Sequence, residues 1–120
     1  REEGSGTRES FVHLVMGKER ISRGALTQES NGAVKELVKG DPVAIGYMSL
    51  GLVGRELKAV KVDGVVPTAE NVIAGTYKLT RPFLFITQGA LRPDAQQFMD
   101  YVLSPEGQNT LESEGLVREK

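Results

Sequence analysis

Apolar residues in this 120-residue chain follow two spacings that alternate along the sequence. In some stretches they recur every three or four residues, which is the spacing of one face of an α-helix. In others they gather into short continuous runs, which are typical of buried strands. Glycine and proline separate the stretches, and no internal repeat is present. The alternation predicts the α/β class, with a mixed β-sheet flanked by helices.

Five segments combine the helical spacing with helix end signals. Serine, threonine or asparagine can cap the first free amides, a proline suits the first helical position, and a glycine suits the end. The expected helices span residues 5–17, 30 or 31 to 40, 68–75, 93–103 and 104–115. For the second helix, Ser30 and Asn31 are both possible caps. The polar residues 18–30 are expected to form an exposed connection.

Two apolar runs are expected to be strands. Residues 43–48 are almost continuously apolar, the pattern of a strand covered on both faces. Residues 57–62 include two lysines and precede an Asp-Gly turn, which places them nearer an edge. Residues 77–87 are expected to be extended, and Pro82 marks an edge, a strand start or a hinge.

Charge and residue usage exclude several classes of function. The chain carries 15 basic and 16 acidic side chains, so a nucleic-acid partner is not expected. The absence of cysteine excludes disulfides, thiolate zinc sites and cysteine nucleophiles. His13 is the only histidine, so we expect neither a metal site nor a Ser-His-Asp centre.

Membrane segments are not expected either. The apolar runs are far below the roughly 20 residues that cross a bilayer. Residues 1–5 have neither the basic start nor the apolar stretch of a signal peptide, so none is expected in the sequence shown.

Residues 4–7, Gly-Ser-Gly-Thr, open the first expected helix and suit an anion. The first amides of a helix have no partners within it and lie at the positive end of its dipole. The glycines let a bound oxyanion approach the backbone closely, and Ser5 and Thr7 add hydroxyl donors. Arg1 adds a positively charged guanidinium. The simpler interpretation is a well-capped helix with a flexible glycine entry.

Residues 1–8, Arg-Glu-Glu-Gly-Ser-Gly-Thr-Arg, resemble the oxyanion loop of the phosphate-binding proteins that serve bacterial and archaeal phosphate ABC importers. Four later blocks resemble that family in the same order, so the resemblance covers almost the whole chain. They are residues 44–51, 67–72, 77–82 and 98–108.

The resemblance implies a partial periplasmic-binding-protein fold of type II, in which two α/β lobes close on a dehydrated phosphate. It implies that Arg1 makes the charge-assisted contact, that Ser5 and Thr7 donate hydrogen bonds, and that Gly6 offers its bare amide. Arg8 either contacts phosphate or pairs with neighbouring acids. The resemblance implies a binding protein and not an enzyme, with no catalytic residue, cofactor or metal.

The resemblance also divides the chain. Residues 1–80 would be the second-lobe portion that carries the loop, and residues 81–120 would be a hinge strand and C-terminal helices that pack on the first lobe. The family's first lobe is absent from this sequence. We therefore expect that segment, or self-association, to cover the apolar stripe of Phe98, Met99, Val102 and Leu103.

By the same resemblance, the partners would be inorganic phosphate and the permease of an ABC importer, and the protein would be exported, either periplasmic or anchored at the cell surface. Two alternatives stay open. One is a fragment of a phosphoryl-transfer enzyme with a glycine-rich phosphate loop, although the lysine of that loop and a magnesium-binding carboxylate pair are lacking. The other is an interaction module in which the loop only caps a helix.

Overall fold

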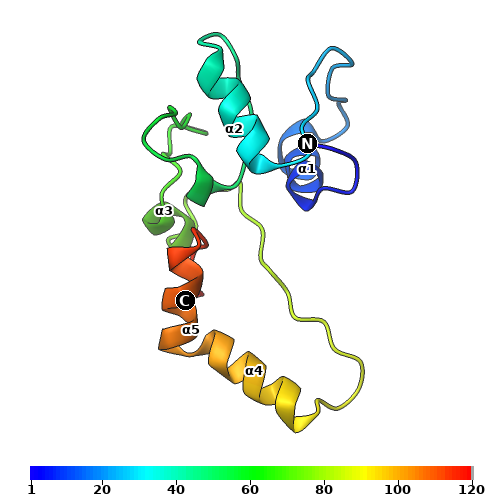
Figure 1. Ribbon diagram of the computed structural model, residues 1–120, viewed down its shortest axis with the longest axis vertical. Coiled ribbons are helices and arrows are strands. Elements are labelled where there is room, and N and C mark those ends of the chain that lie inside the picture. Colours follow the sequence, from blue (N-terminus) through cyan, green and yellow to red (C-terminus); the bar gives the residue numbers. More distant parts are fainter. Residues whose placement is uncertain (120) are drawn as a thin grey trace.

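The computed structural model describes residues 1–119 as short helical elements joined by long extended segments (Figure 1). In chain order they are α1 (Gly6–Phe11), η1 (Val12–Met16), α2 (Asn31–Gly40), η2 (Leu50–Leu52), α3 (Ala69–Ile73), α4 (Pro93–Leu103) and α5 (Pro105–Ser113). The element η1 is a π-helical turn that continues α1 directly, and η2 is a single 3-10 turn. All five helices expected from the sequence are confirmed.

Side-chain caps explain where most of these helices begin. A serine or threonine oxygen accepts a backbone amide at the start of α1, α2, α3 and α5, and the residues are Ser5, Ser30, Thr68 and Ser104. Helix α4 starts instead with Pro93 at its first position. Of the two possible caps of α2, Ser30 takes the role, since its Oγ accepts from the Ala33 amide at 3.0 Å. The Asn31 side chain is thereby left for another contact.

The expected sheet is not present within residues 1–119. The one β-pairing there is an isolated antiparallel bridge between Val62 and Val65 around the Asp63-Gly64 turn. Residues 43–48 and 57–62, which the sequence predicts as strands, do not form strands in this structure, so the mixed sheet is not confirmed. A strand needs a neighbour whose backbone groups face its own, and no described segment takes that position. Val43 and Ile45 are instead 89% and 86% exposed.

The chain from residue 77 to α4 is an extended stretch that pairs with no strand among the described residues. Its Tyr77 amide donates to the Asn71 carbonyl, and its Thr80 amide donates to the Lys78 carbonyl, both at 3.0 Å. In Figure 1 the stretch runs, in yellow-green, from the region below α2 to the far end of α4. Helices α4 and α5 then return toward α3. The expectation of an extended segment here is confirmed.

Helices α4 and α5 meet backbone to backbone. Gly107 of α5 is buried, and a Cβ on it would overlap the Tyr101 carbonyl oxygen and stand 2.7 Å from that of Val102. The Gln108 amide donates to the same Val102 carbonyl at 2.8 Å. Only glycine permits so close a crossing.

A second glycine contact brings the end of the chain back to η2. A Cβ on Gly115 would stand 2.6 Å from the Gly51 Cα, and one on Gly51 would stand 2.7 Å from the Gly115 carbonyl carbon. The residues after α5 therefore lie against the part of the chain that precedes the extended stretch.

These elements do not enclose a core of their own. Val34 is the one buried apolar side chain within residues 1–119. The accessible surface is 9441 Å², whereas a compact protein of 13.0 kDa exposes about 6300 Å². The radius of gyration is 16.6 Å, against about 14 Å for a compact domain of this length. Among the residues that the structure describes, no helix has the length and apolar character needed to span a bilayer.

Candidate functional site

The loop of residues 1–5 turns sharply into α1. Gly4 has a φ of +82°, which glycine adopts without strain. Ser5 is only 6% exposed, and its Oγ accepts from the Arg8 amide at 3.3 Å while its carbonyl accepts from the Glu9 amide at 2.9 Å. Ser5 is thus the helix cap that its sequence context predicts.

Two predicted donors stay free at this turn. Within residues 1–119, the amides of Gly6 and Thr7 have no acceptor. The Thr7 hydroxyl also makes no hydrogen bond to the described residues. Ser5 accepts through its oxygen and keeps its own hydroxyl hydrogen available. The structure therefore brings three of the four predicted site residues together with unused donors.

Arg1, the fourth predicted residue, is held in place by its neighbours. Its Nε and Nη2 donate to the two carboxylate oxygens of Glu2 at 2.8 and 2.9 Å, and its Nη1 donates to Asn31 Oδ1 at 2.8 Å. The side chain is 13% exposed. A guanidinium has five N–H donors, so two of them remain for a ligand, one on each terminal nitrogen.

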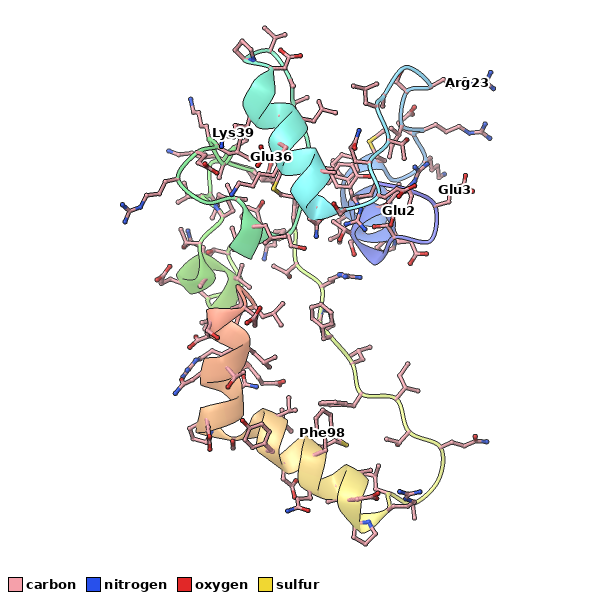
Figure 2. The ribbon with its side chains drawn as sticks, in the orientation of Figure 1. Glu2, Glu3, Arg23, Glu36, Lys39 and Phe98 are labelled. Atoms are coloured by element: carbon pink, nitrogen blue, oxygen red, sulfur yellow. The ribbon has the colours of Figure 1, made fainter. Side chains whose placement is uncertain are left out.

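The ion pair between Arg1 and Glu2 shifts the pKa values of both side chains. The hydrogen bond from Arg1 lowers the pKa of Glu2 to about 2, and the same bond raises the pKa of Arg1. Glu2 therefore stays ionised at neutral pH and balances the charge of Arg1. Figure 2 shows Glu2 beside α1 and Glu3 farther out.

Neighbouring segments hold this loop from two sides. Asn31, which accepts from Arg1, donates to Ser49 Oγ at 3.1 Å. The Arg1 main-chain nitrogen donates to the Tyr47 hydroxyl at 3.2 Å. Sequence reasoning missed Asn31 and Ser49 as supports, because nothing in the spacing of distant polar residues signals that they meet.

Within residues 1–119 Arg8 pairs with no carboxylate, although such a pair was one of the two roles expected for it. Its Nη1 donates instead to the Arg1 carbonyl at 2.8 Å. The interaction closes the loop, because it joins the first turn of α1 to the residue at the loop's start.

Arg81 also reaches this loop, and sequence reasoning missed it. A Cβ added to Gly6 would overlap Arg81 Nη1 and stand 3.1 Å from Arg81 Cζ. The guanidinium lies 5.3 Å from the centre of the Phe83 ring. It makes no hydrogen bond or ion pair with any other residue in the described part of the chain. No local pattern predicts a contact between segments so far apart in sequence.

A separate hollow is lined by residues of the loop, of α1 and of η1. Its volume is about 320 Å³, and its lining includes Glu3, Arg8, Glu9 and His13. Two carboxylates make it a poor place for an anion. No group of three histidine, aspartate or glutamate side chains within residues 1–119 has an arrangement that could hold a metal ion.

Comparison with known proteins agrees with the resemblance seen in the motifs. A family model described as a PBP superfamily domain matches residues 1–106. The phosphate-binding protein PstS 2 of Streptococcus agalactiae serotype V is 35% identical over 98% of this chain and 43% of its own length. The phosphate-binding protein PstS of Bacillus subtilis strain 168 is 32% identical over 92% of this chain and 37% of its own length.

A solved structure matches the backbone closely. It is the crystal structure of a phosphate ABC transporter, phosphate-binding protein from Streptococcus pneumoniae TIGR4, with a TM-score of 0.88 and 33% identity. The match covers 100% of this chain and 50% of that protein. The chain thus spans less than half the length of the two curated relatives and half of the solved structure.

Proposed function

The chain belongs to the PBP superfamily, and on that premise we propose that it is the phosphate-binding portion of the solute-binding protein of a phosphate ABC importer. One observation carries the proposal. The loop that resembles the family's oxyanion loop presents the unpaired amides of Gly6 and Thr7 beside an arginine that keeps two free donors. The relatives reported above are named phosphate-binding proteins.

In the proposed complex each loop residue has one task. Arg1 makes the charge-assisted contact, Gly6 gives its amide, Thr7 gives amide and hydroxyl, and Ser5 gives its hydroxyl hydrogen. Glu2 and Asn31 orient Arg1. No bond of the ligand is made or broken, so the protein is a carrier and not an enzyme.

We propose that a second lobe completes the fold. Residues 1–80 would belong to the lobe with the loop, and residues 81–120 would form a hinge strand and helices that pack on the first lobe. The expected mixed sheet would form when strands from elsewhere in the longer protein pair with residues 43–48 and 77–87. Neither segment pairs with a strand among the described residues, which supports this assignment.

The uncovered apolar surface supports the same completion. Phe98, Leu103, Phe83 and Ile86 are between 52% and 91% exposed. The chain exposes about 3000 Å² more than a compact protein of its mass, which exceeds the roughly 1600 Å² of a standard interface. The first-lobe segment is the proposed cover, and in its absence copies of this chain would associate through the same surface.

A complete cleft is needed for tight binding. Three or four charge-assisted hydrogen bonds of about 1.5–3 kcal/mol each oppose an association cost of about 4–15 kcal/mol. The isolated chain should therefore bind phosphate at roughly millimolar Kd. In the full-length protein, export to the periplasm or cell surface would place the site outside the membrane, and lobe opening at the permease would release phosphate.

The test is a phosphate titration of the full-length protein, read as its thermal unfolding midpoint. A ligand that binds only the folded state stabilises it by about 2.7 kcal/mol at a hundred times Kd, so phosphate should raise the midpoint. Thr7→Val should reduce the rise, and Ser22→Ala, in the exposed connection, should not. Ser5→Ala also removes a cap, so the Thr7 variant is the cleaner probe.

Sulfate gives the control for selectivity. The contacts proposed for Arg1, Ser5, Gly6 and Thr7 are all donated to the anion, and donors alone do not separate phosphate from sulfate. If selectivity lies in the first lobe, the isolated chain should respond equally to both anions. A full-length protein whose midpoint does not respond to phosphate would contradict the proposed function.

A further inference from the structure

The three arginines around the loop differ in what they contact. Arg1 is engaged by Glu2 and Asn31, and Arg8 by the Arg1 carbonyl. Arg81 has neither a carboxylate nor a carbonyl partner within residues 1–119, and its guanidinium lies against the face of Gly6. Of the three, it is therefore the one whose five N–H donors are all unused.

Positive charge gathers at this position, where Arg81 is exposed to solvent. The free amides of Gly6 and Thr7 present partial positive charge, and the guanidinium adds a full positive charge beside them. Like charges that face each other without an acceptor repel. An oxyanion between them would turn both into attractive contacts.

We propose that Arg81 is a second guanidinium contact for the bound phosphate and supplies charge that Arg1, neutralised by Glu2, does not. The inference rests on the proposed function and adds a residue to its site. An oxygen that accepts from the Gly6 amide at about 2.9 Å lies within reach of Arg81 Nη1, because that nitrogen already touches Gly6.

The origin of Arg81 gives this contact a further role. It comes from the extended stretch between residue 77 and α4, whereas the other donors come from the loop before α1 and from the first turn of α1. A phosphate held by both would join the two segments directly. The Phe83 ring, 5.3 Å from the guanidinium, keeps the side chain near this position.

The experiment compares variants of the full-length protein by phosphate calorimetry. Arg81→Gln should weaken phosphate affinity by about tenfold or more, as loss of a charged hydrogen bond does. Arg81→Lys should recover part of the lost affinity, since lysine restores the positive charge but not the planar guanidinium that can donate two parallel hydrogen bonds. Arg23→Gln is the matched control, because Arg23 lies in the exposed connection far from the loop in Figure 2.

A second readout separates ligand contact from a structural role. Without phosphate, the midpoint of Arg81→Gln should differ little from that of the unsubstituted protein, because no hydrogen-bond partner is lost and the contact with the exposed Phe83 ring is weak. With phosphate, its midpoint should rise less. Gly6→Ala keeps the backbone amide, but its new methyl group would displace the Arg81 guanidinium. It should therefore lower the phosphate affinity of the parent protein. In a protein that already carries Arg81→Gln, it should cause little further loss of phosphate affinity.

The results differ according to whether the role of Arg81 or the phosphate-binding function of the loop is wrong. Affinity lost in Thr7→Val but unchanged in Arg81→Gln would overturn the role of Arg81 and leave the loop intact. Affinity unchanged in both variants would overturn the proposed loop itself.

Discussion

Phe11 and Tyr47 stack face to face, with ring centroids 4.1 Å apart and ring planes 3° from parallel. The pair joins the last residue of α1 to the extended run 43–48. The Tyr47 hydroxyl also accepts from the Arg1 main-chain nitrogen at 3.2 Å. One tyrosine thus sets the position of the first helix and of the loop that precedes it.

Two substitutions at Tyr47 should separate these roles. Tyr47→Phe keeps the stack and loses one hydrogen bond, so the free energy of unfolding should fall by about 0.5–1.5 kcal/mol. Tyr47→Ala also loses the ring contact and should cost about 2 kcal/mol or more, since an aromatic pair adds 0.5–1.5 kcal/mol beyond burial. Urea unfolding of the full-length protein measures both. Equal losses in the two variants would show that the stack contributes nothing.

The contact between Gly51 and Gly115 predicts that neither tolerates a methyl group. In Gly51→Ala the new Cβ would meet the Gly115 backbone, which cannot rotate away as a side chain can. The free energy of unfolding should fall by about 1–3 kcal/mol. Gly40→Ala is the control, because nothing lies within 4 Å of a Cβ there; alanine in a helix should be neutral or stabilising. Hydrogen exchange at residues 114–118 should rise in the first variant only.

The pKa of Glu2 provides a pH test of the pair with Arg1. Carbon-detected NMR titration should give a pKa of about 2 for Glu2, below the ordinary 4.5. A lowered folded-state pKa means that the pair stabilises the protein above about pH 4.5 and that this contribution is lost as the pH falls toward 2. Arg1→Gln should move the pKa toward 4.5, and Arg23→Gln should not. A Glu2 pKa near 4.5 in the parent protein would contradict the pairing.

Replacing Phe98 should affect association in the isolated chain and stability in the full-length protein. Phe98 is 60% exposed and meets the Phe85 ring edge to face, with centroids 6.1 Å apart; Figure 2 shows it directed from α4 toward the extended stretch. Phe98→Ser should reduce self-association of the isolated chain in sedimentation velocity. In the full-length protein it should lower the unfolding midpoint, because the first lobe would cover this face.

Gln97→Ser is the control for that experiment, since Gln97 is an exposed neighbour on the same helix. It should change neither the sedimentation of the chain nor the midpoint of the full-length protein. If Phe98→Ser left the full-length midpoint unchanged, the proposed cover would be in the wrong place.

Helices were predictable from the sequence because their signals are local. The capping hydroxyls of Ser5 and Ser104 and the proline at position 93 act within one turn of the residues they affect. The strands were not, because an apolar run such as 43–48 specifies a tendency to be covered and not the segment that covers it. In this chain no described segment does so, and Val43 and Ile45 stay exposed.

The candidate site also contains residues that could be predicted from local sequence and residues that could not. The grouping of Ser5, Gly6 and Thr7 at one turn could be predicted because they are consecutive and open a helix. The state of Arg1 could not, because it depends on Asn31, which is available only since Ser30 takes the capping role. Arg81 is the extreme case, because it reaches Gly6 from a segment that no short-range pattern connects to the loop.

The contact between Gly51 and Gly115 also bears on the order of folding. It closes a loop of about 60 residues, and the chain entropy lost in such a closure is about 4 kcal/mol. Two glycines bury almost no apolar surface in return. The α4–α5 pair can form early because its contacts are close in sequence, whereas the return of the chain end to η2 belongs to a late step, after other contacts have offset that entropy.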